Sequence, residues 1–162
     1  MKFARTLRLD ASDAQVFPLA AAPEEWAVTG TFAFAHDDPT DWSRKDQLAF
    51  KSGWLGTESF GRSTFVQVAV IPDAQAEAVV RRLAGHIFQN FGAPDMLAAT
   101  DAARHEVADM ASLCGDHAAG TLLAIERDLT DDGIAERVRV APRRDEGDHA
   151  RIWTVEVDET ED

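Results

Sequence analysis

Three residues of this chain, His105, Cys114 and His117, carry the side chains best suited to bind a transition metal. Imidazole nitrogen and thiolate sulfur are the ligands that zinc prefers in proteins. His105 and Cys114 are nine residues apart, about two and a half helical turns, so they would lie at different levels of a helix. His117 follows Gly115, and no second Cys–His pair completes a tetrahedral set. A metal-dependent enzyme using His105, Cys114 and His117 is an alternative, but the sequence predicts neither a metal site nor a cofactor.

A glycine-rich segment, residues 53–64, contains a near match to a nucleotide-binding P-loop. The run Gly56-Thr57-Glu58-Ser59-Phe60-Gly61-Arg62-Ser63 has the required glycine spacing, with arginine in place of the lysine. A P-loop binds phosphate through backbone N–H groups and leads into a helix. Here the following residues predict a strand, and Glu58 would place a carboxylate inside the phosphate cradle. We therefore interpret the segment as a hairpin whose glycines permit positive φ.

Trp54, Glu58 and Arg62 are the candidate ligand- or partner-binding residues of this segment. Tryptophan offers an apolar face, and the other two side chains add one charge of each sign beside a strand expected to be rigid. The opposing interpretation is that Glu58 and Arg62 pair with each other and the glycines only turn the chain. A shared binding site requires Trp54 and Arg62 to line one concave surface open to solvent.

The composition limits the partners and the location. With 162 residues, 45% of them hydrophobic, the chain can form one ordinary core, and its formal net charge is −13. An acidic surface repels phosphate backbones and anionic lipids, so we expect neither nucleic-acid nor membrane binding, whereas a protein partner or homo-oligomer stays open. No apolar run is long enough to span a bilayer, no secretory signal is visible, and one cysteine suits a reducing compartment. These observations predict a cytoplasmic protein.

Residues 63–92 carry the clearest structural pattern. Ser63 to Ile71 is β-branched or apolar at nearly every position, which predicts a central strand. A helix is expected over about residues 74–91, capped by Asp73, with one apolar stripe: Ala76, Val79, Val80, Leu83, Ile87, Phe88 and Phe91. Asp95 opens a second helix over about residues 96–114, and the short link makes the two helices neighbours.

The remaining segments predict a mainly antiparallel sheet. Strands are expected over residues 2–9, 15–17 and 28–35, and in a meander over 121–128, 134–140 and 152–157; Asp41 is expected to cap a helix ending near Gly53. Strands grouped before and after a helix pair predict an α+β fold, with the two helices covering one face of the sheet. Residues 1–162 are taken as a single domain with frayed final residues.

Across most of its length the chain resembles an uncharacterised family of short bacterial proteins, a domain of unknown function. The resemblance rests on the chain length, on the segment from Trp54-Leu55-Gly56 to Phe60-Gly61-Arg62-Ser63-Thr64, and on the meander after the helix pair. It implies no catalytic residue and no activity.

The leading functional hypothesis is a non-enzymatic cytosolic accessory or protein-interaction protein. The chain has no G-x-S-x-G elbow and no other local motif for nucleophilic catalysis, so an enzyme is not favoured. The first alternative is a small-molecule binding module with a site near residues 53–64. The second is the metal-dependent enzyme described above.

Overall fold

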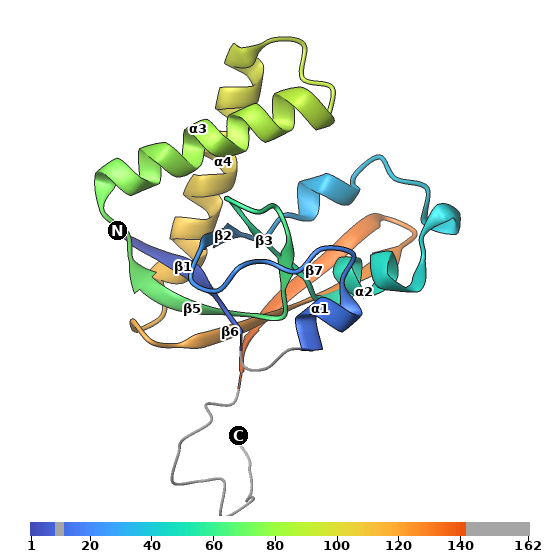
Figure 1. Ribbon diagram of the computed structural model, residues 1–162, viewed down its shortest axis with the longest axis horizontal. Helices are drawn as coiled ribbons and strands as arrows, with labels where there is room; N and C mark the ends of the chain where they lie inside the picture. The colour runs from blue at the N-terminus through green and yellow to red at the C-terminus, as the bar shows by residue number, and fades with distance from the viewer. Residues whose placement is uncertain (9–11, 142–162) are drawn as a thin grey trace, which may run out of the picture.

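The computed structural model describes residues 1–8 and 12–141. Their seven strands form one sheet in the order β4-β3-β2-β1-β5-β6-β7, in which each neighbouring pair is antiparallel and the sheet curls into a half-barrel (Figure 1). The strands are β1 (Lys2–Leu7), β2 (Trp26–Val28), β3 (Trp54–Gly56), β4 (Arg62–Ser63), β5 (Phe65–Val70), β6 (Leu122–Thr130) and β7 (Gly133–Val140).

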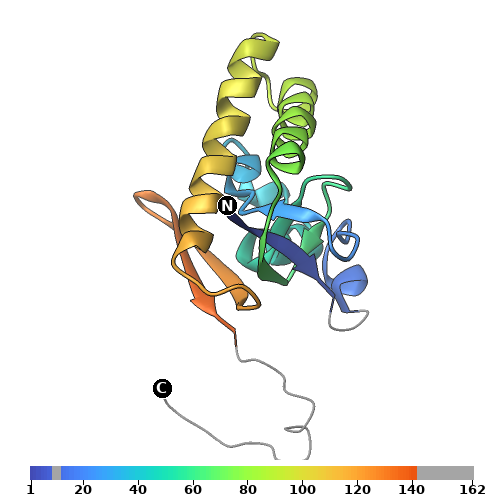
Figure 2. The ribbon, with the colours of Figure 1, turned by 90° about the vertical axis from the view of Figure 1, so that its left-hand side faces the viewer.

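The two longest helices lie side by side over one face of the sheet (Figures 1 and 2). Helix α4 packs against β1 and β2, and α3 packs along α4. The α+β prediction, with a helix pair on one face of an antiparallel sheet, is confirmed. The helical segments are α1 (Ser12–Val16), η1 (Thr31–Phe34), η2 (Pro39–Asp41), α2 (Arg44–Ser52), α3 (Asp73–Asn90) and α4 (Met96–Gly115), of which η1 and η2 are 3-10 turns.

The stripe of α3 forms part of the core over most of the helix. Ala76, Val79, Val80, Leu83 and Ile87 are buried in one cluster with β5 residues. The last two members of the predicted stripe are not buried: Phe88 is 43% and Phe91 38% exposed, because the end of α3 extends past the sheet (Figure 2).

The predicted cap of α4 is confirmed; α3 begins where predicted, but its predicted cap is wrong. The Asp95 carboxylate accepts a 2.8 Å hydrogen bond from the Ala98 N–H and caps α4. Pro72, not Asp73, occupies the cap position of α3, and no side chain bonds the first turn there.

Two predicted strands in the first third are wrong. Residues 15–17 overlap α1, where the Asp13 carboxylate accepts a 2.7 Å hydrogen bond from the Thr64 hydroxyl. The strand predicted over 28–35 ends at Val28, because Gly30 takes the left-handed conformation, φ 77°, and η1 follows. A side chain on Gly30 would lie 2.5 Å from Leu55 Cβ, so close packing also requires glycine there.

Helix α2 and the meander follow the predictions in outline. Ser43 and Asp46 form a capping box at the start of α2, while the predicted cap, Asp41, lies in η2. The β6–β7 hairpin is confirmed. The strand predicted over 152–157 lies outside the described residues. None of the helices in the described ranges is both long and apolar enough to cross a bilayer.

Candidate functional site

The structure does not bring Trp54, Glu58 and Arg62 together on an open surface. The Trp54 side chain is fully buried in the core, and Arg62 is 8% exposed. Arg62 turns inward and donates hydrogen bonds to the carbonyl oxygens of Gly53 (3.1 Å) and Gly30 (3.2 Å). Glu58 is exposed and lines a different hollow, with Arg5, Trp26 and Gln75 among its walls. The geometric condition for a shared site at Trp54 and Arg62 is therefore not met.

The P-loop-like segment does bind an anion, and that anion is a carboxylate of the chain itself. Glu25 is buried, and one of its oxygens accepts hydrogen bonds from the backbone N–H groups of Glu58 (2.8 Å) and Ser59 (2.9 Å). The other oxygen accepts from the Ser59 hydroxyl (2.6 Å) and the Ala22 N–H (2.7 Å). Successive N–H groups converging on one anion form a nest, the device that P-loops use for phosphate.

The glycine at the start of this nest is required by the Glu25 carboxylate. A Cβ at Gly56 would lie 2.3 Å from the nearer Glu25 oxygen, so the carboxylate could stay in its hydrogen-bonded position only with glycine there. Phe60 completes the turn in the left-handed conformation, φ 57°, and its ring stacks on His86 of α3 at a centroid distance of 3.8 Å. The hairpin predicted for residues 53–64 is present as the antiparallel pair β3 and β4, but the positive φ expected of its glycines is found at Phe60 instead. The nest within the hairpin is filled from inside the molecule.

Arg62 and Arg127 are two buried cations that share one aromatic neighbour. Both guanidinium groups lie over the ring of Phe34, at 4.6 Å and 5.5 Å from its centroid. Arg127 follows Leu123 and Ile125 on the inward face of β6, as the two-residue period of a strand requires. The sheet thus places a cation at the end of an apolar row.

The hydrogen bonds of Arg127 connect β6 with two other segments. Its guanidinium donates to the carbonyl oxygens of Phe50 (2.7 Å) and Thr29 (2.5 Å) and to the Thr31 hydroxyl (2.7 Å). Glu136 of β7 is its ion-pair partner, with 3.6 Å between Arg127 Nε and the carboxylate oxygen. Phe50 belongs to the last turn of α2, where carbonyl oxygens have no helical partner, so Arg127 caps this helix end.

Burial of the two guanidinium groups costs free energy, because their charges lose contact with water. Removal from water lowers the pKa of Arg62 to about 9, and the neighbouring charge of Arg127 acts in the same direction. Burial also lowers the pKa of Arg127 to about 10, an effect that Glu136 partly opposes. Arg62 bonds only neutral carbonyl groups in the contacts above, so the pair leaves a surplus of positive charge inside the fold.

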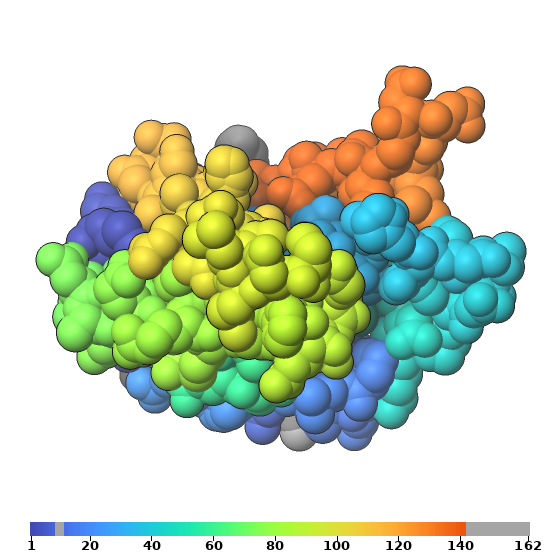
Figure 3. Space-filling view, turned by 90° about the horizontal axis from the view of Figure 1, so that it is seen from above, coloured from blue at the N-terminus to red at the C-terminus, as the bar shows by residue number. Residues whose placement is uncertain are grey.

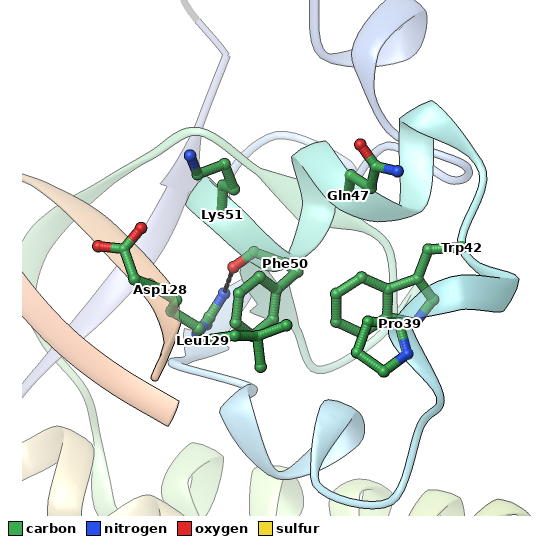
Figure 4. Close-up of a pocket in the computed structure, with 8 residues that line it drawn as sticks. Pro39, Trp42, Gln47, Phe50, Lys51, Asp128 and Leu129 are labelled. Atoms are coloured by element: carbon green, nitrogen blue, oxygen red, sulfur yellow. Dashed lines mark hydrogen bonds between the residues drawn. The ribbon is translucent and has the colours of Figure 1, made fainter. Parts of the chain in front are cut away.

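Beside Arg127 lies a hollow of about 300 Å³, which we call the α2 pocket (Figure 4). Four of its eight described lining residues are aromatic or aliphatic, and the other four are polar or charged. The rings of Trp42 and Phe50 lie 5.0 Å apart, and Phe34 packs edge-on against both from behind. The described residues lining the pocket are Pro39, Trp42, Gln47, Phe50, Lys51, Arg127, Asp128 and Leu129.

Figure 4 shows how the polar groups are arranged. Lys51 and Asp128 lie on one side of Phe50, and Trp42 and Pro39 lie on the other. The Arg127 side chain has no exposed surface, so its charge acts on the pocket through its electric field. Lys51 is exposed at the end of α2 and can touch a ligand directly.

The three residues of the metal hypothesis are not gathered into a site. His105 is exposed on α4, and Cys114 is fully buried in the core, where desolvation raises the pKa of its thiol to about 11. Within residues 1–8 and 12–141, no three His, Cys, Asp or Glu side chains are placed to hold a metal ion.

Sequence reasoning missed the α2 pocket because its walls come from residues 39–51 and 127–129, two stretches far apart in the chain. Trp42, Phe50 and Arg127 carry no common motif, and only the sheet brings β6 to α2. One signal was present: Arg127 continues the inward row of Leu123 and Ile125, and an arginine on the buried face of a strand needs a partner.

No curated protein and no solved structure shows significant similarity to the chain. One family model matches residues 1–158, nearly the whole sequence. The chain therefore belongs to the family described as "Family of unknown function (DUF6505)".

Proposed function

We propose that this protein is a small-molecule binding module whose site is the α2 pocket. The observation that carries the proposal is a hollow of about 300 Å³ whose described lining combines a tryptophan and a phenylalanine with four polar or charged residues. Ligand sites are typically concave, mostly apolar and of about this size or larger, with few polar groups that set orientation.

The aromatic wall is held in place before any ligand arrives. Phe34 contacts Trp42 and Phe50 edge-on, at centroid distances of 5.7 Å and 5.3 Å. The capping box of Ser43 fixes the start of α2, and Arg127 holds the Phe50 carbonyl at its end. A wall that is already ordered loses little conformational entropy when a ligand binds.

The lining residues suit contact rather than nucleophilic chemistry. The eight described lining residues include no serine, cysteine or histidine, the side chains that most often act as nucleophile or paired base. The non-enzymatic character in the leading hypothesis is therefore kept in this proposal, and the site moves from residues 53–64 to α2.

The test is a screen of uncharged and charged aromatic fragments followed by 1H–15N spectra of the full chain. Binding in the α2 pocket should shift the Trp42 indole N–H signal, assigned by its loss in Trp42→Phe. Trp42→Ala should abolish binding, whereas Leu97→Ala, an exposed change on α4, should leave it intact. Fragments that bind without moving the Trp42 signal, or that bind Trp42→Ala equally well, would contradict the proposal.

A second candidate function is protein contact through the tip of the helix pair, defined as residues 88–97. The tip exposes four large apolar side chains: Phe88 (43%), Phe91 (38%), Met96 (49%) and Leu97 (72%). It lies at the centre of the face seen in Figure 3. Exposed apolar clusters of this kind mark interaction surfaces.

The composition of the tip favours a second copy of the same chain as the partner. Asp95 is the only charged residue within 88–97, in a protein whose residues are 28% charged. Two acidic molecules repel each other elsewhere, so an apolar surface with a single charge is where they can meet.

The oligomeric state tests this candidate. Light scattering coupled to size exclusion should show a dimer that Leu97→Asp converts to a monomer, whereas Ala118→Asp, an exposed change after α4, should not. A monomer at the highest attainable concentration would remove the second-copy assignment.

A further inference from the structure

The end of α2 has an electrostatic character opposite to that of an ordinary helix C-terminus. Unpaired carbonyl oxygens normally make this end negative and repel anions. Here Arg127 binds the Phe50 carbonyl and Arg62 binds the Gly53 carbonyl at the same helix end. Two full positive charges therefore replace the partial negative charge beside the α2 pocket.

The charge balance of the pocket lining has the same sign. The eight described lining residues carry two cations, Lys51 and Arg127, against one carboxylate, Asp128. Outside the lining, Glu136 pairs with Arg127 and Asp37 accepts a hydrogen bond from the Trp42 indole, while Arg62 adds a cation behind Phe34. Among the described residues, Glu136 is the only carboxylate within 4.0 Å of either arginine. A pocket lining with one more cation than anion stands out on a chain of net charge −13, because most of the surface repels anions.

Lys51 is the cation placed to touch an anion. It is exposed in the last turn of α2 and lines the pocket beside Phe50. No described carboxylate lies within 4.0 Å of its ammonium group, although Asp128 lines the same side. The ammonium can therefore accept a ligand carboxylate as its partner.

We infer that the α2 pocket binds a monocarboxylate with a flat apolar body, such as an aromatic acid. The ring would lie against Trp42 and Phe50, and the carboxylate would meet Lys51 in the field of Arg127. This inference rests on the proposed function and specifies its ligand class. The lowered pKa values of both buried arginines support it, since a bound anion relieves the same electrostatic cost.

The test compares three probes of the same shape on the full chain: 2-naphthoate, 2-naphthamide and 2-naphthylmethylammonium. Dissociation constants are measured by titration of the Trp42 indole N–H signal at low salt. We expect the carboxylate to bind at least about fivefold more tightly than either other probe, as one favourable ion pair of modest strength provides. Added salt should weaken the binding of the carboxylate probe and of neither other probe.

Lys51→Gln supplies the matched variant and Lys45→Gln its control, because both remove one exposed lysine from α2 but only Lys51 lines the pocket. Lys51→Gln should raise the naphthoate dissociation constant about fivefold and leave the naphthamide constant unchanged. An equal loss of naphthoate affinity in the two lysine variants would show a general effect of net charge and would overturn the role of Lys51.

The outcomes separate the two proposals. If the amide or the ammonium probe binds as tightly as the carboxylate, the ligand class is wrong, while the pocket still binds small molecules. If none of the three probes and no fragment of the wider screen moves the Trp42 signal, the proposed function fails and the inference with it.

Discussion

Arg62 and Arg127 stand on different strands, yet both connect the same two segments. Each donates to a carbonyl oxygen in the turn after β2, Gly30 for Arg62 and Thr29 for Arg127, and to one at the end of α2, Gly53 and Phe50 respectively. Phe34 lies beneath both guanidinium groups. This double connection holds the aromatic wall of the α2 pocket against the sheet.

Replacing Arg127 with methionine should lower the free energy of unfolding by about 3 kcal/mol. The methionine fills similar space but leaves the Phe50 and Thr29 carbonyls without donors inside the fold. Urea unfolding measures the change. The control is Arg137→Met, whose guanidinium is 70% exposed and pairs with Glu126, and which should cost less than about 1 kcal/mol. Equal effects of the two substitutions would refute the role assigned to Arg127.

Glu25→Ala should destabilise the protein by about 3 kcal/mol, because four hydrogen-bond donors of the nest and the Ala22 turn lose their acceptor. Glu58→Ala, which removes an exposed carboxylate from the same loop, should change stability by less than about 0.5 kcal/mol. Thermal unfolding measures both.

Acetate provides an independent check on the nest. It carries the carboxylate that Glu25→Ala lacks and should raise the melting temperature of this variant more than that of the wild type. Equal shifts in the two proteins would mean that the loop has no specific anion site.

Leu83→Ala should destabilise by about 2–5 kcal/mol, the usual cost of a cavity in a packed core. Leu83 is fully buried in the cluster that joins α3, α4 and the sheet. Leu19→Ala is the matched change at an exposed site and should cost less than about 0.5 kcal/mol. A loss that small at Leu83 would contradict the layer assignment of α3.

Stability should fall as the pH drops below about 6.5, in part through His86. Burial, followed by the charge of Arg62, lowers the pKa of His86 below its usual 6.5. The unfolded chain therefore binds a proton in this window before the folded chain does, so acid favours unfolding.

His86→Phe should flatten this dependence, because a phenyl ring can keep the stack on Phe60 without binding a proton. His105→Gln, at an exposed position of α4, serves as the control and should keep the wild-type profile. Chemical denaturation at a series of pH values measures the free energy of unfolding. An unchanged pH dependence of this free energy in His86→Phe would exclude His86 as its cause.

Local patterns predicted the elements whose residues interact with near neighbours in the sequence. The α3 stripe through Ile87, the Asp95 cap and the β6–β7 hairpin depend on contacts within a few turns or one hairpin, so the sequence was sufficient. The strand predicted over 28–35 failed because Gly30 is left-handed, a choice set by Leu55 and Arg62 packing onto it.

The candidate site also shows the difference between what local patterns predict and what contacts between distant segments decide. The sequence by itself determined that residues 53–64 form a glycine-rich hairpin, because glycine spacing is a local property. It predicted no anion site there, and the nest of backbone N–H groups is found only in the structure. Only the tertiary structure decided that Glu25 fills that nest, that Trp54 and Arg62 are buried, and that Lys51, Phe50 and Arg127 share a pocket. These contacts join residues far apart in the chain, and their geometry depends on sheet order and strand register, which no local pattern encodes.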